Sequence, residues 1–120
     1  MKDKTVECEV ERLLAVIGGK WKVLILRELS LGTKRHTELR RALPGIAQKV
    51  LTSQLRELEL DGAIERKDLG TNRPHVEYSL TPFGKQLQQL VLEMHQLALK
   101  NCGTLKRTPV AGRFEKRGVN

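Results

Sequence analysis

The residues of this sequence that are best suited to chemistry are polar and basic groups between positions 47 and 60. Gln, Ser and Thr side chains can form hydrogen bonds with base edges or phosphates, whereas Lys and Arg bind phosphates or guanine. No acidic residue precedes Glu57 in this segment, and an acid in its first two turns would repel a nucleic-acid backbone. We therefore expect contact with double-stranded DNA, and an ordinary solvated helix is the alternative. The candidate residues are Gln48, Lys49, Thr52, Ser53 and Arg56.

A helix must hold these groups, because leucines recur at helical spacing between them. The predicted inner stripe consists of Leu51, Leu55 and Leu58. The preceding segment 37–43 predicts a supporting helix, with Thr37 as its N-cap and Glu38 at the positive end of the helix dipole. A Pro-Gly pair separates the two segments. The pattern is that of a helix-turn-helix whose second helix enters the major groove.

Further basic side chains surround this pair of helices. They lie just before the first helix, on it, and in a later turn, and they are Lys34, Arg35, His36, Arg40, Arg73 and His75. Arg73 belongs to a protruding turn, from which an arginine can enter a narrow minor groove. The alternative interpretation is that these residues are ordinary solvated surface charges and that Arg73 is simply a turn residue.

The remaining periodicities predict the elements that position these groups. A first helix is expected over Glu9–Ile17, and a central buried helix over Lys20–Leu29, which is apolar on most sides. Alternating residues at 63–69 and 75–80 flank a turn rich in Gly, Asn and Pro, and they predict a β-hairpin. A Thr-Pro pair then begins the last helix. The order predicts a mainly α fold with a small β-hairpin wing (α+β), a winged helix-turn-helix.

The last helix carries an apolar seam with the spacing four, three, four and three, which is typical of a helix that pairs with another helix. A chain this short buries only about two-thirds of its unfolded surface. We therefore expect a homodimer in which the N- and C-terminal helices form the interface. The expected interface residues are Val10, Leu13, Leu14, Phe83, Leu87, Leu90, Met94 and Leu97.

The charge balance favours a polyanionic partner. The 120 residues include 22 Lys and Arg against 14 Asp and Glu, a formal net charge of +8. Nucleic acid is the first candidate partner and an acidic membrane surface the second. The few aromatic residues disfavour stacking on single strands or RNA. We expect one folded domain over residues 1–102 and a basic, disordered tail over 103–120, which is either a plain solvated terminus or a binder of phosphates.

Several classes of function find no support in the residues. The three histidines lack ligand spacing, so no metal site is expected, and the two cysteines form neither a disulfide scaffold nor a metal cluster. Neither an enzyme nor a cofactor is expected, because nucleophile sets, carboxylate pairs and phosphate loops do not stand out. The longest apolar run, Val23–Leu26, is too short to span a membrane, and the charged first residues do not form a signal peptide. We expect a cytoplasmic protein without a membrane partner, and a protein-interaction module is the alternative to a DNA-binding one.

Residues 10–80 resemble the HxlR family of winged helix regulators, relatives of the MarR group. The matching runs include Ile17-Gly18-Gly19-Lys20-Trp21, Glu38-Leu39-Arg40-Arg41, Leu43-Pro44-Gly45-Ile46, Gln54-Leu55-Arg56-Glu57-Leu58 and Val76-Glu77-Tyr78-Ser79-Leu80-Thr81-Pro82. The resemblance implies a homodimer that binds an inverted repeat and controls nearby promoters through the residues proposed above. Ala47 departs from the family by standing where a Ser usually opens the recognition helix, a lost cap worth about 1 kcal/mol.

The resemblance also draws attention to Cys8, because several relatives use an N-terminal cysteine to sense oxidants or electrophiles. Glu9 follows it here, where the family often has Pro. Its expected place just before a helix favours the reactive thiolate, whereas the acidic neighbours Glu7, Glu9 and Glu11 disfavour it. Two interpretations stay open: a sensor of an oxidant or small-molecule effector, and a small apolar residue packed at the dimer interface.

Overall fold

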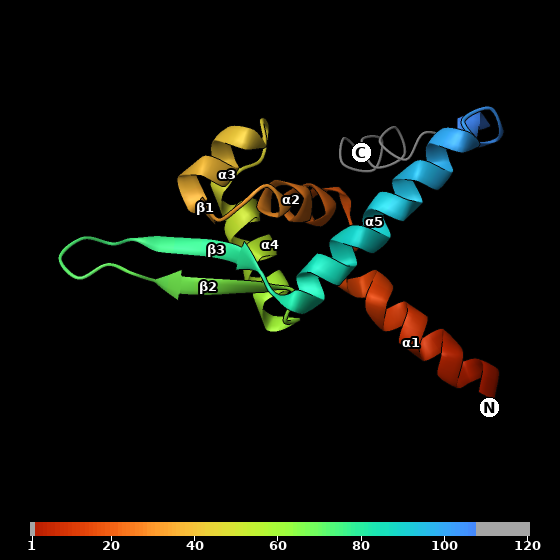
Figure 1. Cartoon of the computed structure of the whole chain (residues 1–120), viewed down its shortest axis with the longest axis horizontal. Coiled ribbons are helices and arrows are strands. Elements are labelled where there is room, and N and C mark those ends of the chain that lie inside the picture. Colours follow the sequence, from red (N-terminus) through yellow and green to blue (C-terminus); the bar gives the residue numbers. More distant parts are fainter. Residues whose placement is uncertain (1, 108–120) are drawn as a thin grey trace. The chain divides into compact units, whose positions relative to one another are not determined.

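The computed structural model describes residues 2–107, with side chains described for residues 8–105. Its elements follow the predicted order and contain a small three-stranded sheet, which confirms the winged helix-turn-helix fold (Figure 1). Two compact units meet between Gln88 and Gln89, inside the last long helix. The elements are α1 (Lys2–Val16), α2 (Lys20–Ser30), β1 (Lys34–Arg35), α3 (His36–Ala42), α4 (Gln48–Leu60), β2 (Ile64–Asp68), β3 (Val76–Leu80), α5 (Pro82–Lys100) and the 3-10 helix η1 (Thr104–Arg107).

The core of the first unit lies among α2, α3 and α4. Leu26 of α2 and Leu39 of α3 have no exposed surface. The predicted inner stripe of α4 is also buried, since Leu51, Leu55 and Leu58 are at most 1% exposed. Full burial of such a side chain stabilises the fold by about 1.5–3 kcal/mol. These leucines therefore fix the rotation of α4 about its axis and turn its polar side outward.

The sheet is antiparallel, with the strand order β1-β3-β2. The predicted hairpin is present, with Ile64 opposite Leu80 at its base, and β2 and β3 run side by side to a long connecting loop (Figure 1). β1 pairs with the other edge of β3, where Lys34 lies opposite Tyr78. The sequence does not predict β1, because two residues are too few to show an alternating pattern.

Two of the predicted helix starts are wrong. α1 begins at Lys2 rather than Glu9. The N-cap of α3 is Arg35 rather than Thr37, and the Arg35 backbone N–H donates to the Glu38 carboxylate at 2.8 Å. An acid three residues after the cap supplies this contact from inside the helix. For α5, the Gly84 N–H donates to the Thr81 hydroxyl at 3.0 Å, which confirms Thr81 as the cap.

The second unit contains the remainder of α5 and η1. Thr104–Arg107, at the start of the segment predicted as a tail, form a 3-10 helix. The rest of the predicted tail, 108–120, lies outside the described residues, and the predicted domain limit at residue 102 stays a prediction. No helix within residues 2–107 has the length and apolar character needed to cross a membrane.

Candidate nucleic-acid interface

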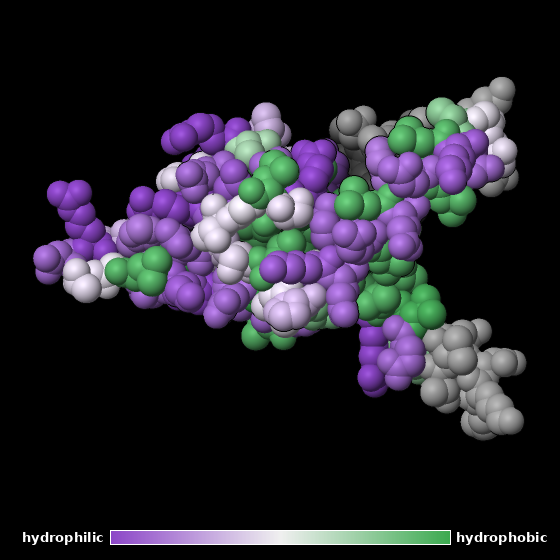
Figure 2. Space-filling model, in the orientation of Figure 1, coloured by the Kyte–Doolittle hydropathy of each residue, from purple (hydrophilic) through white to green (hydrophobic). Residues whose placement is uncertain are grey.

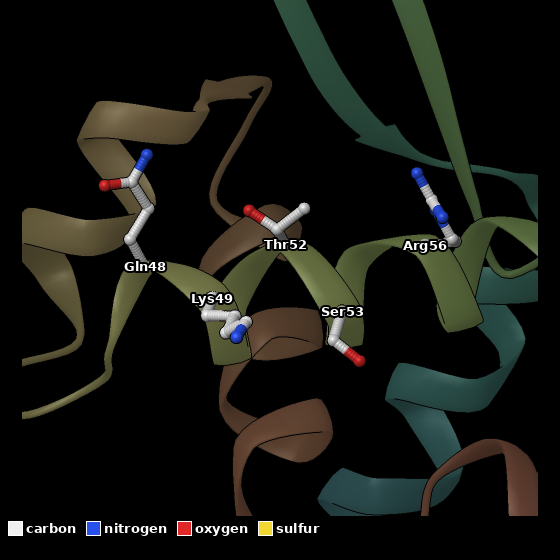
Figure 3. Close-up of a pocket in the computed structure, with 5 residues that line it drawn as sticks. All are labelled: Gln48, Lys49, Thr52, Ser53 and Arg56. Carbon is white, nitrogen blue, oxygen red and sulfur yellow. The ribbon is translucent and has the colours of Figure 1, made fainter.

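The outer side of α4 brings the five predicted polar residues together. All five are exposed and line one surface depression (Figure 3). Gln48, Thr52 and Arg56 follow one another at four-residue intervals and project to the same side of the helix. Lys49 and Ser53 form a second row beside them. The arrangement offers hydrogen-bonding groups along the helix and a cation near each end.

The start of α4 lacks a side-chain cap. Ala47 precedes the helix in an extended conformation and has no side-chain oxygen that could accept from the first N–H groups. The Ala47 carbonyl still accepts from the Leu51 N–H at 2.9 Å, which closes the first turn. The departure from the family at this position therefore leaves the helix intact but its first amides without a side-chain partner.

A histidine from the supporting helix reaches the middle of this surface. The Nε2 atom of His36 lies 3.2 Å from the Thr52 hydroxyl oxygen, a hydrogen bond between α3 and α4. Burial, followed by the charge of Arg40, lowers the pKa of His36 below its ordinary value. A neutral ring is therefore favoured, and it can donate to Thr52 or accept from it, depending on the tautomer.

The other basic residues near the helix-turn-helix lie on α3 and β1. Arg40 lines a second depression together with Arg41, Thr37 and the turn that leads to α4. Arg35 is exposed at the end of β1, whereas Lys34 is half-buried. Arg41 is exposed beside Arg40, as expected for a second basic residue of the supporting helix.

A third depression joins α4 to the sheet. It is lined by Thr52, Arg56 and Glu59 of α4 and by Arg66 and Tyr78 of the hairpin. Arg66 and Tyr78 lie opposite each other in the strand register. Neither residue is identified from the sequence, since only the folded hairpin brings them next to α4.

The long loop at the tip of the hairpin is held by backbone contacts and displays Arg73. The Gly70 N–H donates to the Asp68 carboxylate at 3.1 Å, and the Leu69 N–H donates to the His75 carbonyl at 2.7 Å. A Cβ atom at Gly70 would lie 1.9 Å from the Arg73 carbonyl oxygen, so the turn requires glycine. Arg73 is exposed, whereas His75 is half-buried. The Nε2 atom of His75 lies 2.9 Å from Oε2 of Glu77. The contacts of both residues with DNA stay predictions.

The first acidic residue of α4 is paired with a buried lysine. Lys22 Nζ of α2 lies 2.5 Å from Glu57 Oε1, and the two side chains are 8% and 49% exposed. This ion pair balances the negative charge of Glu57 next to Arg56. This ion pair is not identified from the sequence, because Lys22 sits within the apolar segment 20–29 and nothing there links it to α4.

The thiol of Cys8 is exposed, but it lies inside α1 rather than before a helix as expected. The helix dipole acts mainly on the first turn, and Cys8 lies beyond the first turn of α1. Cys102 is exposed as well. In the part of the chain that the structure describes, His, Cys, Asp and Glu side chains form no group that could hold a metal ion.

Comparisons with known proteins match most of the described residues to regulators of the helix-turn-helix type. The family model described as HxlR-like helix-turn-helix matches residues 16–106. The chain is 46% identical over 99 residues, 82% of its length, to the uncharacterized HTH-type transcriptional regulator YybR of Bacillus subtilis (strain 168), and the match covers 79% of that protein. A solved regulator of the MarR family from Enterococcus faecalis V583 has a TM-score of 0.76 and 39% identity, over 85% of this chain and 93% of that one. The redox regulator HypR in its reduced form has a TM-score of 0.75 and 45% identity, over 83% of this chain and 99% of that one.

Proposed function

This chain belongs to the HxlR-like helix-turn-helix family, and on that premise we propose that it regulates transcription as a homodimer bound to an inverted repeat in double-stranded DNA. Its relatives are HTH-type transcriptional regulators rather than enzymes, which confirms that no catalytic role is to be expected. The surface of α4 carries the proposal. Five uncharged polar or basic side chains share one exposed depression there, and Lys22 balances the nearest acid.

Homodimerisation is supported by apolar side chains that the single chain leaves exposed. On α1, Val10 and Leu14 are 51% and 53% exposed, and on α5, Met94 and Leu97 are 47% and 63% exposed. Figure 2 shows hydrophobic surface on both helices, whereas the hairpin is largely hydrophilic. A two-fold dimer presents two copies of α4, and such a dimer fits two half-sites of an inverted repeat.

The DNA-binding role is tested by selecting sequences from random duplexes and then measuring affinity by fluorescence anisotropy. We expect the wild-type protein to enrich an inverted repeat. Lys49→Ala removes one cation from the α4 surface of each subunit and should weaken binding of the dimer about tenfold, with a salt dependence reduced by about two ions. Lys85→Ala removes the same charge from an exposed position of α5 and is the matched control.

Failure to enrich any sequence would contradict the proposal and favour a winged helix that binds another protein. An equal effect of Lys49→Ala and Lys85→Ala would show that net charge, rather than the α4 surface, determines the affinity.

We further propose that Cys8 senses electrophiles or oxidants. HypR, which is similar over most of this chain, is a redox regulator, and the Cys8 side chain is exposed and open to reagents. Alkylation with N-ethylmaleimide should lower the affinity for the selected repeat at least tenfold in wild type and in Cys102→Ser, but not in Cys8→Ser. If alkylated wild type keeps its affinity, Cys8 is instead a structural residue of the proposed dimer interface.

A further inference from the structure

The hydrogen bond between His36 and Thr52 involves a side chain of the α4 surface, which is proposed to contact DNA. Thr52 occupies the middle of the α4 surface, because it lies between Gln48 and Arg56 in the outward row (Figure 3). Like Arg56, it also lines the depression between α4 and the hairpin. His36 is half-buried at the start of α3, with its Nε2 atom 3.2 Å from the Thr52 hydroxyl oxygen. His36 therefore contacts the side chain that is most central to this surface.

A bond to the hydroxyl group fixes the orientation of the whole threonine side chain. Threonine carries its hydroxyl and its methyl group on the same carbon, so holding one group in place also places the other. In Figure 3, the hydroxyl and the methyl of Thr52 point in different directions, with the methyl on the side toward Arg56. The hydroxyl is engaged by His36, and the methyl is the group left free on the exposed surface.

We propose that His36 is a positioning residue that holds Thr52 so that its methyl group contacts the C5-methyl group of a thymine in the major groove. The proposal rests on the proposed function and adds to it one base preference and the residue that enforces it. Thymine is the only DNA base that presents a methyl group in the major groove, and apolar side-chain groups recognise it there. Without His36, Thr52 could rotate and offer its hydroxyl to other base edges.

The test replaces thymine by deoxyuracil, one position at a time, in the repeat selected by the wild-type protein. This change removes only the C5-methyl group from the duplex. One position in each half-site should lose about fourfold in wild-type affinity, the effect of one methyl-sized apolar contact. His36→Ala should abolish this sensitivity. Thr52→Ser keeps the hydroxyl but lacks the methyl, and it should abolish the sensitivity as well.

Two further variants separate positioning from a structural role. His36→Gln can place a polar atom close to that of Nε2, and it should restore part of the sensitivity to deoxyuracil. The double variant His36→Ala with Thr52→Ser should bind the unmodified thymine-containing repeat no more weakly than Thr52→Ser alone, since His36 acts through Thr52. His95→Ala, an exposed histidine of α5, is the matched control and should behave as wild type.

The outcomes distinguish this inference from the proposed function. A wild-type protein that selects a repeat but tolerates deoxyuracil everywhere would overturn the thymine contact alone. Unchanged sensitivity in His36→Ala, or additive losses in the double variant, would overturn the positioning role of His36. A wild-type protein with no sequence preference would overturn the proposed function together with this inference.

Discussion

At the scale of single residues, His36 links the stability of the domain to pH. Burial and the charge of Arg40 lower the pKa of His36 below its ordinary value of about 6.5. The unfolded chain therefore binds a proton at His36 at a higher pH than the folded chain does. Stability from the neutral ring is fully present above about pH 6.5 and is lost as the pH falls through the folded-state pKa.

We expect the free energy of unfolding to decrease more in wild type than in His36→Gln when the pH is lowered from about 7.5 to about 5.5. Urea denaturation at both pH values measures this difference. His95→Gln changes an exposed histidine and should keep the wild-type dependence. Identical pH dependence in wild type and His36→Gln would show that His36 titrates alike in the folded and unfolded chain.

Some residues of the site could be predicted from the sequence, and others could not. Gln48, Thr52 and Arg56 could be predicted to share a surface, because helical spacing alone places residues four apart on one side. The contact of His36 with Thr52 could not be predicted, since it depends on how α3 packs against α4. Arg66 likewise reaches the α4 surface only through the pairing of β2 and β3.

At the scale of elements, the ion pair between Lys22 and Glu57 ties α2 to α4, and its two halves differ in burial. The Lys22 side chain is 8% exposed and that of Glu57 is 49% exposed. Glu57→Gln leaves a buried ammonium group without its carboxylate and should destabilise the fold by about 1–3 kcal/mol. Lys22→Met leaves a carboxylate that water can solvate and fills the space with an apolar chain. Its cost should stay below about 1 kcal/mol.

Urea denaturation of both variants measures this asymmetry, with Glu59→Gln as a control on the exposed surface of the same helix. If Lys22→Met lowered the free energy of unfolding more than Glu57→Gln, the unpaired Glu57 carboxylate would be the costly group, and this explanation would be wrong.

Elements with a long, regular pattern could be predicted, whereas short or closely packed ones could not. α4 and the hairpin follow their apolar periodicity, and α2 matches its predicted range within one residue. β1 has two residues and exists only because β3 offers a free edge. The close approach of α5 to the hairpin is equally hidden, because a Cβ atom at Gly84 would lie 2.0 Å from the Ala63 carbonyl oxygen. The residues around Gly84 in the sequence do not indicate that another segment packs against it.

At the scale of the whole molecule, the proposed dimer accounts for apolar surface that a single chain leaves in contact with water. Leu14 of α1 and Leu97 of α5 are each more than half exposed. A buried glutamate is costly when it has no partner, so Leu14→Glu or Leu97→Glu should convert the dimer to monomers in sedimentation experiments. Leu31→Glu changes a leucine that is 72% exposed outside the proposed interface, and it should remain dimeric.

The same variants test whether dimerisation determines DNA affinity. A monomer reaches one half-site only and loses the effective concentration that links two α4 helices in a dimer. We expect Leu97→Glu to bind the selected inverted repeat about a hundredfold more weakly than wild type. Its affinity for a single half-site should match that of Leu31→Glu, because the α4 surface itself is unchanged. If Leu97→Glu is monomeric and yet binds the full repeat like wild type, one α4 surface is sufficient, and the inverted-repeat model of recognition is wrong.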